Sequence, residues 1–270
     1  MQNIKEYVAT KKLVLKEKLK GNNLKSVIVQ VGNVEASNRY VRNKIKDLEE
    51  VGITAELLKF SEDISEEALL AQIHRLNTDD TVTGYLVQLP LPKHISEEKV
   101  NLAIDPTKDI DGFHPLSKTI AATPLGVYNY LKDQNFEFAG KNAVIIGRSN
   151  IVGRPMHKLL LNANMNVVML HTKTTEEDKR FYLEHADLIV VAVGKAKFLD
   201  GDLIKDGATV IDVGINRMED GKLCGDVDFE KVKERASYIT PVPGGVGPMT
   251  IAMLMNNVIK ATKLQNDIKY

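Results

Sequence analysis

Short apolar runs alternate with amphipathic segments along the whole chain. The runs rich in β-branched residues predict strands, and most are continuously apolar, as parallel strands covered on both faces are. These predicted strands are Ser26–Val31, Thr54–Phe60, Tyr85–Leu89, Ala143–Ile146, Val167–Leu170, Leu188–Val193 and Thr209–Val213. Helical spacing between them predicts helices at Asn38–Val51, Glu66–Leu76, Pro124–Lys132, Val152–Leu161, Glu176–His185 and Phe229–Ala236. This alternation predicts an α/β fold with parallel sheets.

Both ends of the chain also predict helices. The segment Met1–Lys12 mixes charged and apolar residues and lacks the uninterrupted apolar core of a signal peptide, so we expect an amphipathic helix there. The segment from Thr250 to about Leu264 is rich in Met and Ile and predicts a helix that packs back on the first half of the chain. Ser65 and Thr123 stand where N-caps would begin two of the other helices.

Helical spacing breaks at Asp133–Lys141, just before a new strand. We therefore predict two α/β domains. The first comprises residues 1–135 together with the helix of residues 250–270, and the second comprises residues 136–249. If the C-terminal helix packs back on the first domain, the two domains share an interdomain cleft, and small-molecule sites commonly lie in such clefts.

Composition places the chain among soluble globular proteins. Of its 270 residues, 43% are hydrophobic and 27% charged. Lysine and arginine together number 36, as do aspartate and glutamate, so net charge favours neither nucleic acid nor an anionic membrane as a partner. The single cysteine, Cys224, permits no intrachain disulfide and favours a reducing, cytoplasmic compartment. No apolar run is long enough to predict a membrane span.

The segment Ser37–Lys44 carries the candidate chemistry of the first domain. Residues three and four apart share a helix face, so Ser37, Tyr40 and Lys44 should lie in a row. We expect Lys44 to lie beside the buried stripe of this helix. A lysine there can serve as an acid–base or charge-positioning group, or it can simply extend its head into water. The expected buried stripe consists of Val41, Ile45 and Leu48.

Two more segments of the first domain carry polar side chains. The apolar run Gly84–Pro92 ends with Gln88 and two prolines, so Gln88 should point from a strand end toward the same cleft rim as Lys44. Asp109 and Asp111 lie in a turn. Because carboxylates routinely cap turns, capping is the expected role for either one alone.

The second domain begins with a candidate phosphate loop. A strand that ends in Gly147 runs into a turn of small residues and then a helix, which places backbone N–H groups and a helix N-terminus on a phosphate. Gly147 would permit the tight turn and Gly153 the close packing of helix on strand, although the spacing is not the full G-x-G-x-x-G. The sequence predicts a Rossmann-type dinucleotide-binding domain here, and an ordinary tight turn is the alternative.

The loop after the next strand indicates which dinucleotide binds. A carboxylate would hold the ribose hydroxyl of NAD there, but His171–Thr174 offers hydroxyls and Lys173 instead. Arg148 projects from the preceding loop, and such groups favour a 2′-phosphate, so we predict NADP.

The segment Asp212–Asn216 should border the nicotinamide. The loop Thr240–Thr250, rich in Pro and Gly, predicts a site loop rather than a plain linker.

Taken together, the motifs of this chain resemble one family, the methylenetetrahydrofolate dehydrogenase/methenyltetrahydrofolate cyclohydrolase family. The resemblance covers nearly the whole chain, and its last motif is highly specific. In chain order the motifs are S-x-x-Y-V-x-x-K, V-Q-L-P-L-P, K-D-I-D-G-F-H-P, G-R-S-x-x-V-G-x-P, D-V-G-I-N and P-V-P-G-G-V-G-P-M-T. The resemblance implies oxidation of 5,10-methylenetetrahydrofolate with NADP and hydrolysis of the methenyl product to 10-formyltetrahydrofolate, within one-carbon metabolism. It also implies a homodimer and no metal.

The resemblance further assigns roles to individual residues. Lys44 would be the main cyclohydrolase residue with Gln88 tuning it, while Tyr40 would stack on the folate and Asp111 would bind the pterin. The remaining substrate contacts would be Leu89, Pro243, Gly244 and Gly247. The cofactor contacts would be Gly147, Arg148, Ser149, Thr172 and Ile215.

Three alternatives stay open at this point. The chain could be a dehydrogenase that has lost the hydrolase step, a noncatalytic NADP-binding protein, or another two-domain dehydrogenase that acts on a shikimate-like acid. The sequence also departs from the family pattern in the loop of residues 115–123. Leu116–Ile120 replaces the usual N-x-G-x-L, and Ala121–Pro124 replaces the usual P-C-T-P.

Overall fold

The computed structural model describes residues 2–268 and divides into two compact units. We call them by their sheets. The five-stranded unit comprises the described residues of Met1–Val8 and Thr123–Thr250, and the three-stranded unit those of Ala9–Ala122 and Ile251–Tyr270. The chain therefore divides at Thr123 rather than at the predicted residue 136, and the first residues group with the second half.

The three-stranded unit contains a parallel sheet with strand order β2-β1-β3. Its central strand β1 buries alternate residues on opposite faces. On one face Val27 and Val29 pack in a core cluster with Leu69 and Ile73, and on the other the Gln30 amide donates to Asn38 at 2.8 Å. The strands are β1 (Lys25–Val31), β2 (Thr54–Phe60) and β3 (Gly84–Val87). The helices are α2 (Glu35–Glu50), α3 (Glu66–Thr78), α4 (Glu97–Ala103) and most of α1 (Ile4–Leu19) and α9 (Val246–Ile268).

The five-stranded unit contains a parallel sheet with strand order β10-β7-β6-β4-β5. Its strands are β4 (Asn142–Ile146), β5 (Asn166–Leu170), β6 (Leu188–Val191), β7 (Thr209–Asp212) and β10 (Tyr238–Ile239). Its helices are α5 (Ala122–Asp133), α6 (Gly153–Asn162), α7 (Glu176–Glu184), the 3₁₀ turn η1 (Gly201–Leu203) and α8 (Phe229–Lys233). A short antiparallel hairpin joins β8 (Asn216–Arg217) and β9 (Leu223–Cys224).

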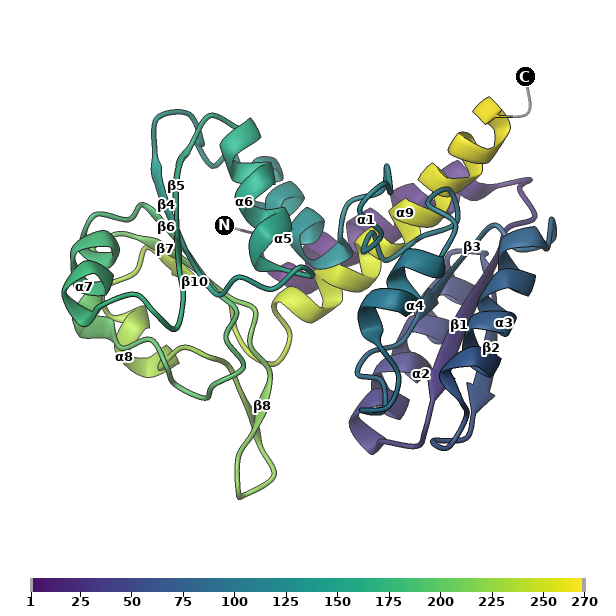
Figure 1. Ribbon diagram of the computed structural model, residues 1–270. Coiled ribbons are helices and arrows are strands. Elements are labelled where there is room, and N and C mark those ends of the chain that lie inside the picture. The colour runs from purple at the N-terminus through teal and green to yellow at the C-terminus, as the bar shows by residue number, and fades with distance from the viewer. Residues whose placement is uncertain (1, 269–270) are drawn as a thin grey trace. The chain divides into compact units, whose positions relative to one another are not determined.

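Helices cover both faces of the five-stranded sheet, as continuously apolar strands require. Ala143 and Ile145 of β4 pack in one cluster with residues of α5 and α6. Val144 and Ile146 of the same strand pack in the other cluster, with residues of α7 and α8. Figure 1 shows these two pairs of helices on opposite sides of the sheet. The prediction of an α/β fold with parallel sheets is confirmed.

Several local predictions need correction. Thr123 is not an N-cap, because α5 begins one residue before it, at Ala122. The hydroxyl of Thr123 instead lies 3.0 Å from the hydroxyl of Thr250. Ser65, in contrast, accepts a hydrogen bond from Ala68 N at 3.1 Å, as a cap does. The sequence prediction missed α4, although Ser96 caps it by the same pattern. It also missed the two-residue strands β8, β9 and β10, which are too short to show periodicity.

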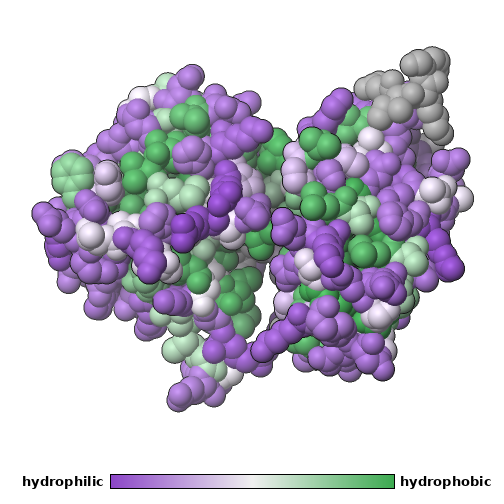
Figure 2. Space-filling model, in the orientation of Figure 1, coloured by the Kyte–Doolittle hydropathy of each residue, from purple (hydrophilic) through white to green (hydrophobic). Residues whose placement is uncertain are grey.

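Both units present a mostly hydrophilic surface in the view of Figure 2, with hydrophobic residues in small patches. Among the helices of residues 2–268, none combines the length and apolarity that a bilayer crossing requires.

Candidate active site

Lys44 lies within the buried stripe of α2. Val41 and Leu48 are buried as predicted, but Ile45 is only partly buried and Lys44 is 5% exposed. The placement of Lys44 beside the stripe was therefore wrong, and the lysine takes the position assigned to Ile45. Positions i, i+3 and i+7 share one helix face, so Val41, Lys44 and Leu48 line up. An ammonium so enclosed does not simply extend into water.

The lysine faces a carboxylate and an aromatic ring. Its Nζ lies 4.0 Å from Asp111 Oδ1 and 5.6 Å from the centroid of the Tyr40 ring. Among the residues that the structure describes, Lys44 forms no hydrogen bond, since 4.0 Å exceeds hydrogen-bond distance. The structure thus brings together Lys44, Tyr40 and Asp111 and leaves the donors of Lys44 available to a bound molecule.

Asp109 and Asp111 have opposite roles. Asp109 is fully buried and accepts hydrogen bonds from Gly112 N at 2.8 Å and His114 N at 2.9 Å, so it is a capping residue as predicted. Asp111 caps nothing, and its partner is the ammonium of Lys44. Burial raises the pKa of the Asp111 carboxyl and the charge of Lys44 opposes that rise. Only the first aspartate is structural, which the sequence pattern did not distinguish.

Gln88 follows β3 and carries an unpartnered oxygen. Its amide nitrogen donates to Leu89 O at 2.7 Å, and a cis peptide bond joins Leu89 to Pro90. The oxygen Oε1 is buried and has no hydrogen-bond partner within the described chain. No hydrogen bond joins Gln88 to Lys44 or Asp111 in that part of the molecule. A buried acceptor without a donor costs about 1–3 kcal/mol, which a ligand donor would recover.

The turn between β4 and α6 can be built only with glycine. Gly147 has φ +116°, and a Cβ on it would lie 2.2 Å from Ala192 O. A Cβ on Gly153 would lie 2.1 Å from Gly147 O. The hydroxyl of Ser149 accepts from Val152 N at 3.1 Å and so shapes the turn from within. The result is a tight turn at the start of α6, where Ser149 accepts from the first backbone N–H groups and the positive end of the helix dipole can attract a phosphate.

Cationic and hydroxyl groups are exposed at the ends of the neighbouring strands β4 and β5. Arg148 and Ser149 follow β4, and Thr172 and Lys173 follow β5. Thr174 is committed locally, because its hydroxyl accepts from His171 N at 3.0 Å. The segment 171–174 has no carboxylate. The donor set therefore fits a dinucleotide with an extra phosphate on its ribose.

A pair of buried aspartates shapes the loops after β6 and β7. Asp226 accepts from the backbone N–H groups of Val193, Gly194 and Lys195 at 2.6–2.9 Å and from the Asn216 side-chain amide at 2.9 Å. This aspartate thereby holds the segment that carries Ile215, which is 54% exposed. The sequence prediction missed Asp226. The sequence feature that could have indicated this residue is the pair Gly225–Asp226, which follows the D-V-G segment that begins at Asp212.

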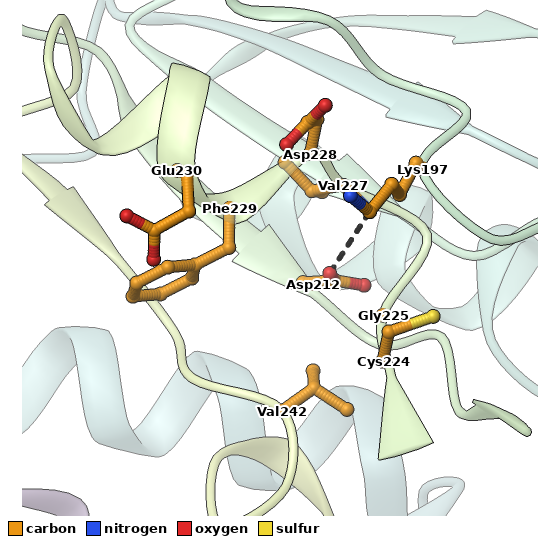
Figure 3. A pocket seen from close by; sticks show the side chains of 9 residues that line it. All are labelled: Lys197, Asp212, Cys224, Gly225, Val227, Asp228, Phe229, Glu230 and Val242. Atoms are coloured by element: carbon orange, nitrogen blue, oxygen red, sulfur yellow. Dashed lines mark hydrogen bonds between the residues drawn. The ribbon is translucent and has the colours of Figure 1, made fainter. Parts of the chain in front are cut away.

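Asp212 is the other member of the pair. It accepts from Gly214 N at 3.0 Å, Asp226 N at 2.9 Å and Val227 N at 3.0 Å. Burial raises the pKa of its carboxyl to about 6. Asp212 also borders a small cavity of about 90 Å³, in which Figure 3 shows its hydrogen bond from Val227. The other lining residues are Lys197, Cys224, Gly225, Asp228, Phe229, Glu230 and Val242.

The loop after β10 has a fixed and unusual shape. The Val242–Pro243 peptide bond is cis, Gly244 has φ +98°, and a Cβ on Gly245 would lie 2.3 Å from Pro241 O. Gly247 lies in the first turn of α9. The loop borders a second cavity of about 500 Å³ within the five-stranded unit. The residues lining it are Gln2, Asn3, Ile4, Lys5, Tyr238, Pro241, Pro243 and Gly244.

Comparison with protein families accounts for both units. A model of the tetrahydrofolate dehydrogenase/cyclohydrolase catalytic domain matches residues 1–111, and the model of the NAD(P)-binding domain of the same family matches residues 121–266. This chain belongs to the tetrahydrofolate dehydrogenase/cyclohydrolase family. The resemblance deduced from the motifs and the Rossmann-type second domain are confirmed. A shikimate-like dehydrogenase is excluded.

Individual relatives match over nearly the full length. The bifunctional protein FolD of Bacillus anthracis is 51% identical over 245 residues, which are 87% of this chain and 85% of that protein. The crystal structure of FolD from Campylobacter jejuni has a TM-score of 0.93 and 47% identity, and covers 97% of this chain and 98% of that one. FolD of Trypanosoma brucei, solved with NADP and an inhibitor, has a TM-score of 0.90 and 31% identity and covers 98% of each chain.

Proposed function

We propose that this chain catalyses the two reactions after which its family is named. It oxidises 5,10-methylenetetrahydrofolate to the methenyl form with NADP, and it hydrolyses that product to 10-formyltetrahydrofolate. The observation that carries this proposal is the buried ammonium of Lys44, which lies 4.0 Å from Asp111 beside the Tyr40 ring without a hydrogen-bond partner in the described structure.

The first reaction asks mainly for positioning. The carbon that is oxidised lies between two nitrogens of the folate, so the cation that forms is delocalised onto both and needs little base catalysis. Asp111 presents a carboxyl that can pair with the polar edge of a pterin, and the Tyr40 ring offers a flat face on which it can stack. The unpartnered oxygen of Gln88 can accept a further hydrogen bond.

The dinucleotide belongs in the five-stranded unit. Gly147 and Gly153 permit the tight turn on which its phosphates would lie, and Ser149 shapes that turn. Arg148 and Thr172 are exposed after the two strand ends and would contact the 2′-phosphate. Ile215 is exposed on the segment that Asp226 holds and can contact the nicotinamide side. When bound, NADP supplies the acceptor for the hydride that leaves the substrate.

The second reaction needs water and proton movement. Water oxygen bonds to the methenyl carbon, one carbon–nitrogen bond breaks to leave the formyl group on the other nitrogen, and one proton is released overall. The ammonium of Lys44 can orient the water and pass protons between it and the leaving nitrogen. Asp111 supports this role because its carboxylate keeps a counter-charge beside the ammonium.

One assay tests the proposal. The purified chain is mixed with methylenetetrahydrofolate and NADP, and the absorbance of NADPH and of the methenyl product is followed with time. We expect NADPH to form and the methenyl signal to decay faster than it does without enzyme. NADPH formation without accelerated decay would identify a dehydrogenase alone, and NADP binding without turnover would identify a noncatalytic protein.

Leu89, Pro243, Gly244 and Gly247 complete the proposed substrate contacts. We also propose that the chain is a homodimer in the cytoplasm, as the family resemblance and the single cysteine suggest. Sedimentation equilibrium would test the assembly, and fractionation of the source cells would test the location.

A further inference from the structure

Asn257 is a polar residue enclosed in the apolar part of α9. It is fully buried, as are the neighbouring apolar residues Met255 and Val258 on the same helix. Its side-chain nitrogen donates to Ile110 O at 2.9 Å and to Ile120 O at 2.8 Å. One amide group thus joins both ends of the loop that contains Asp111, from a position more than a hundred residues later in the chain.

The orientation of this amide is unambiguous. Both partners are carbonyl oxygens, so the NH₂ group must face them, and its two hydrogens match two acceptors. Neither an aspartate nor an apolar residue of the same shape could serve both. The side-chain oxygen of Asn257 is buried and has no hydrogen-bond partner in the described structure. An unpaired oxygen lowers stability, so the fold retains the residue in spite of a cost of about 1–3 kcal/mol.

The loop itself depends on these anchors. Gly112 has φ +74°, and a Cβ on it would lie 2.6 Å from the backbone of Ile120 and Ala121, so the two ends of the loop are in close contact. The carboxylate of Asp109 and the hydroxyl of Thr119 hold its interior. Asn257 is the anchor attached directly to the peptide before Asp111, and Asp111 itself has no hydrogen bond that would fix its backbone or side chain in the described structure.

We propose that Asn257 is a positioning residue that holds the Asp111 carboxylate opposite Lys44 and thereby sets the affinity for the folate substrate. This inference rests on the proposed function. Asn257 acts through the loop and does not touch the substrate. Loss of its amide would release Ile110 O and Ile120 O, and the carboxylate would leave its place by a fraction of an ångström to an ångström. Displacements of that size cost up to about a hundredfold in activity.

The principal test compares Asn257→Leu with Gln265→Leu. Gln265 is a matched control because it also lies on α9 and donates from its amide to loop carbonyls, Thr83 O at 2.6 Å and Thr107 O at 3.4 Å, neither of which belongs to a peptide next to Asp111. We expect Asn257→Leu to raise the KM for methylenetetrahydrofolate about tenfold to a hundredfold and to leave the Kd for NADP within twofold. Gln265→Leu should change neither. An unchanged folate KM in Asn257→Leu would overturn the proposal, as would an equal rise in both variants.

A second measurement separates positioning from general stability. If Asn257 acts through Asp111, the double variant Asn257→Leu, Asp111→Asn should have the same kcat/KM as Asp111→Asn alone, because coupled residues are not additive. Multiplication of the two effects would overturn the proposal. If Asn257→Leu does not fold, Asn257→Ser retains one hydroxyl donor and takes its place in both experiments. Normal kinetics of Asp111→Asn would instead refute the proposed function.

Discussion

Replacement of Lys44 by methionine should separate the two proposed reactions. Methionine is unbranched and of similar length, so it can occupy the apolar stripe of α2 between Val41 and Leu48 without a cavity. The change removes the ammonium that lies 4.0 Å from Asp111 Oδ1. Hydrolysis of methenyltetrahydrofolate should fall about a hundredfold to ten-thousandfold, the range that a positioned acid–base group contributes.

The magnitude of the electrostatic change follows from the geometry. At 4.0 Å and an effective dielectric constant of about 20, the attraction between Lys44 and Asp111 is on the order of 4 kcal/mol. The side chains are 6% and 14% exposed, so salt screens this attraction only weakly. Burial already raises the pKa of Asp111, and Lys44 is the opposing influence. Loss of the Lys44 charge should raise the pKa of Asp111 further. The pH range over which the KM for folate changes should therefore lie higher in Lys44→Met than in the wild type.

The assay follows decay of the methenyl absorbance and formation of NADPH in the same protein samples, with the Kd for NADP measured by fluorescence. The matched control is Lys12→Met, which removes another enclosed lysine in contact with α2. Lys12 pairs with Asp47 and Glu50 at 2.6 and 2.8 Å and has no part in the site. The control should hydrolyse normally. Hydrolysis by Lys44→Met at the wild-type rate, or an equal loss of hydrolysis in both variants, would contradict the role proposed for Lys44.

Further predictions concern the five-stranded unit. Gly147→Ala should abolish measurable NADP binding in a titration, because the added Cβ would lie 2.2 Å from Ala192 O. The control is Gly140→Ala, at a residue with φ +74° and open space around it. This control variant should lose only about 1–2 kcal/mol of stability and bind NADP normally. Arg148→Ala should raise the KM for NADP about tenfold to a hundredfold and leave the KM for NAD nearly unchanged, since it removes the guanidinium proposed to contact the extra phosphate. An equal rise for both cofactors would contradict the assignment. The pKa of Asp212 is raised from 3.8 to about 6, so the folded state holds the proton of this carboxyl more tightly than the unfolded state does. The free energy of unfolding should therefore fall by about 3 kcal/mol as pH rises from about 4 to about 6, and then stay level. Urea unfolding of Asp212→Asn should lack that part of the fall, and an identical pH dependence in wild type and variant would contradict it.

Hydrophobic patterning predicted the inner strands well because they are buried on both faces. The observed strands β1, β4 and β7 differ from their predicted ranges by about a residue at either end. The pattern was weaker for α2, where it assigned the buried position to Ile45 because isoleucine is apolar. The structure buries Lys44 there instead, next to Asp111. The burial of Lys44 is possible because a carboxylate from a distant loop compensates its charge. Helical periodicity, which depends on neighbouring residues alone, does not reveal such a partner.

The anchors of the site were also outside the reach of local pattern. Asp109 and Asp111 have the same local sequence context, and only the tertiary structure shows that one caps a loop while the other faces Lys44. Asn257 and Asp226 act on loops far from them along the chain. The local hint for Asn257 was a pair of asparagines, Asn256 and Asn257, within the apolar run of α9, and sequence alone does not show which of the two is buried.

The buried polar groups of the three-stranded unit differ in whether they have a partner within the chain, and an unpartnered charge among them indicates where a ligand binds. Lys108 donates to Leu76 O and Asp79 O at 3.0 and 2.7 Å, and Asp109 accepts from two backbone N–H groups, so both have partners within the chain. Lys44 and Gln88 Oε1 are enclosed to a similar degree without a hydrogen-bond partner among the described residues. Evolution toward stability alone would replace such groups with apolar ones, since unsatisfied burial is costly. Ser26 Oγ and Asn257 Oδ1 are unpartnered as well, but Lys44 carries a charge and lies beside Asp111. Its presence within α2, together with Gln88 just after β3, therefore favours a bound polar molecule as the missing partner.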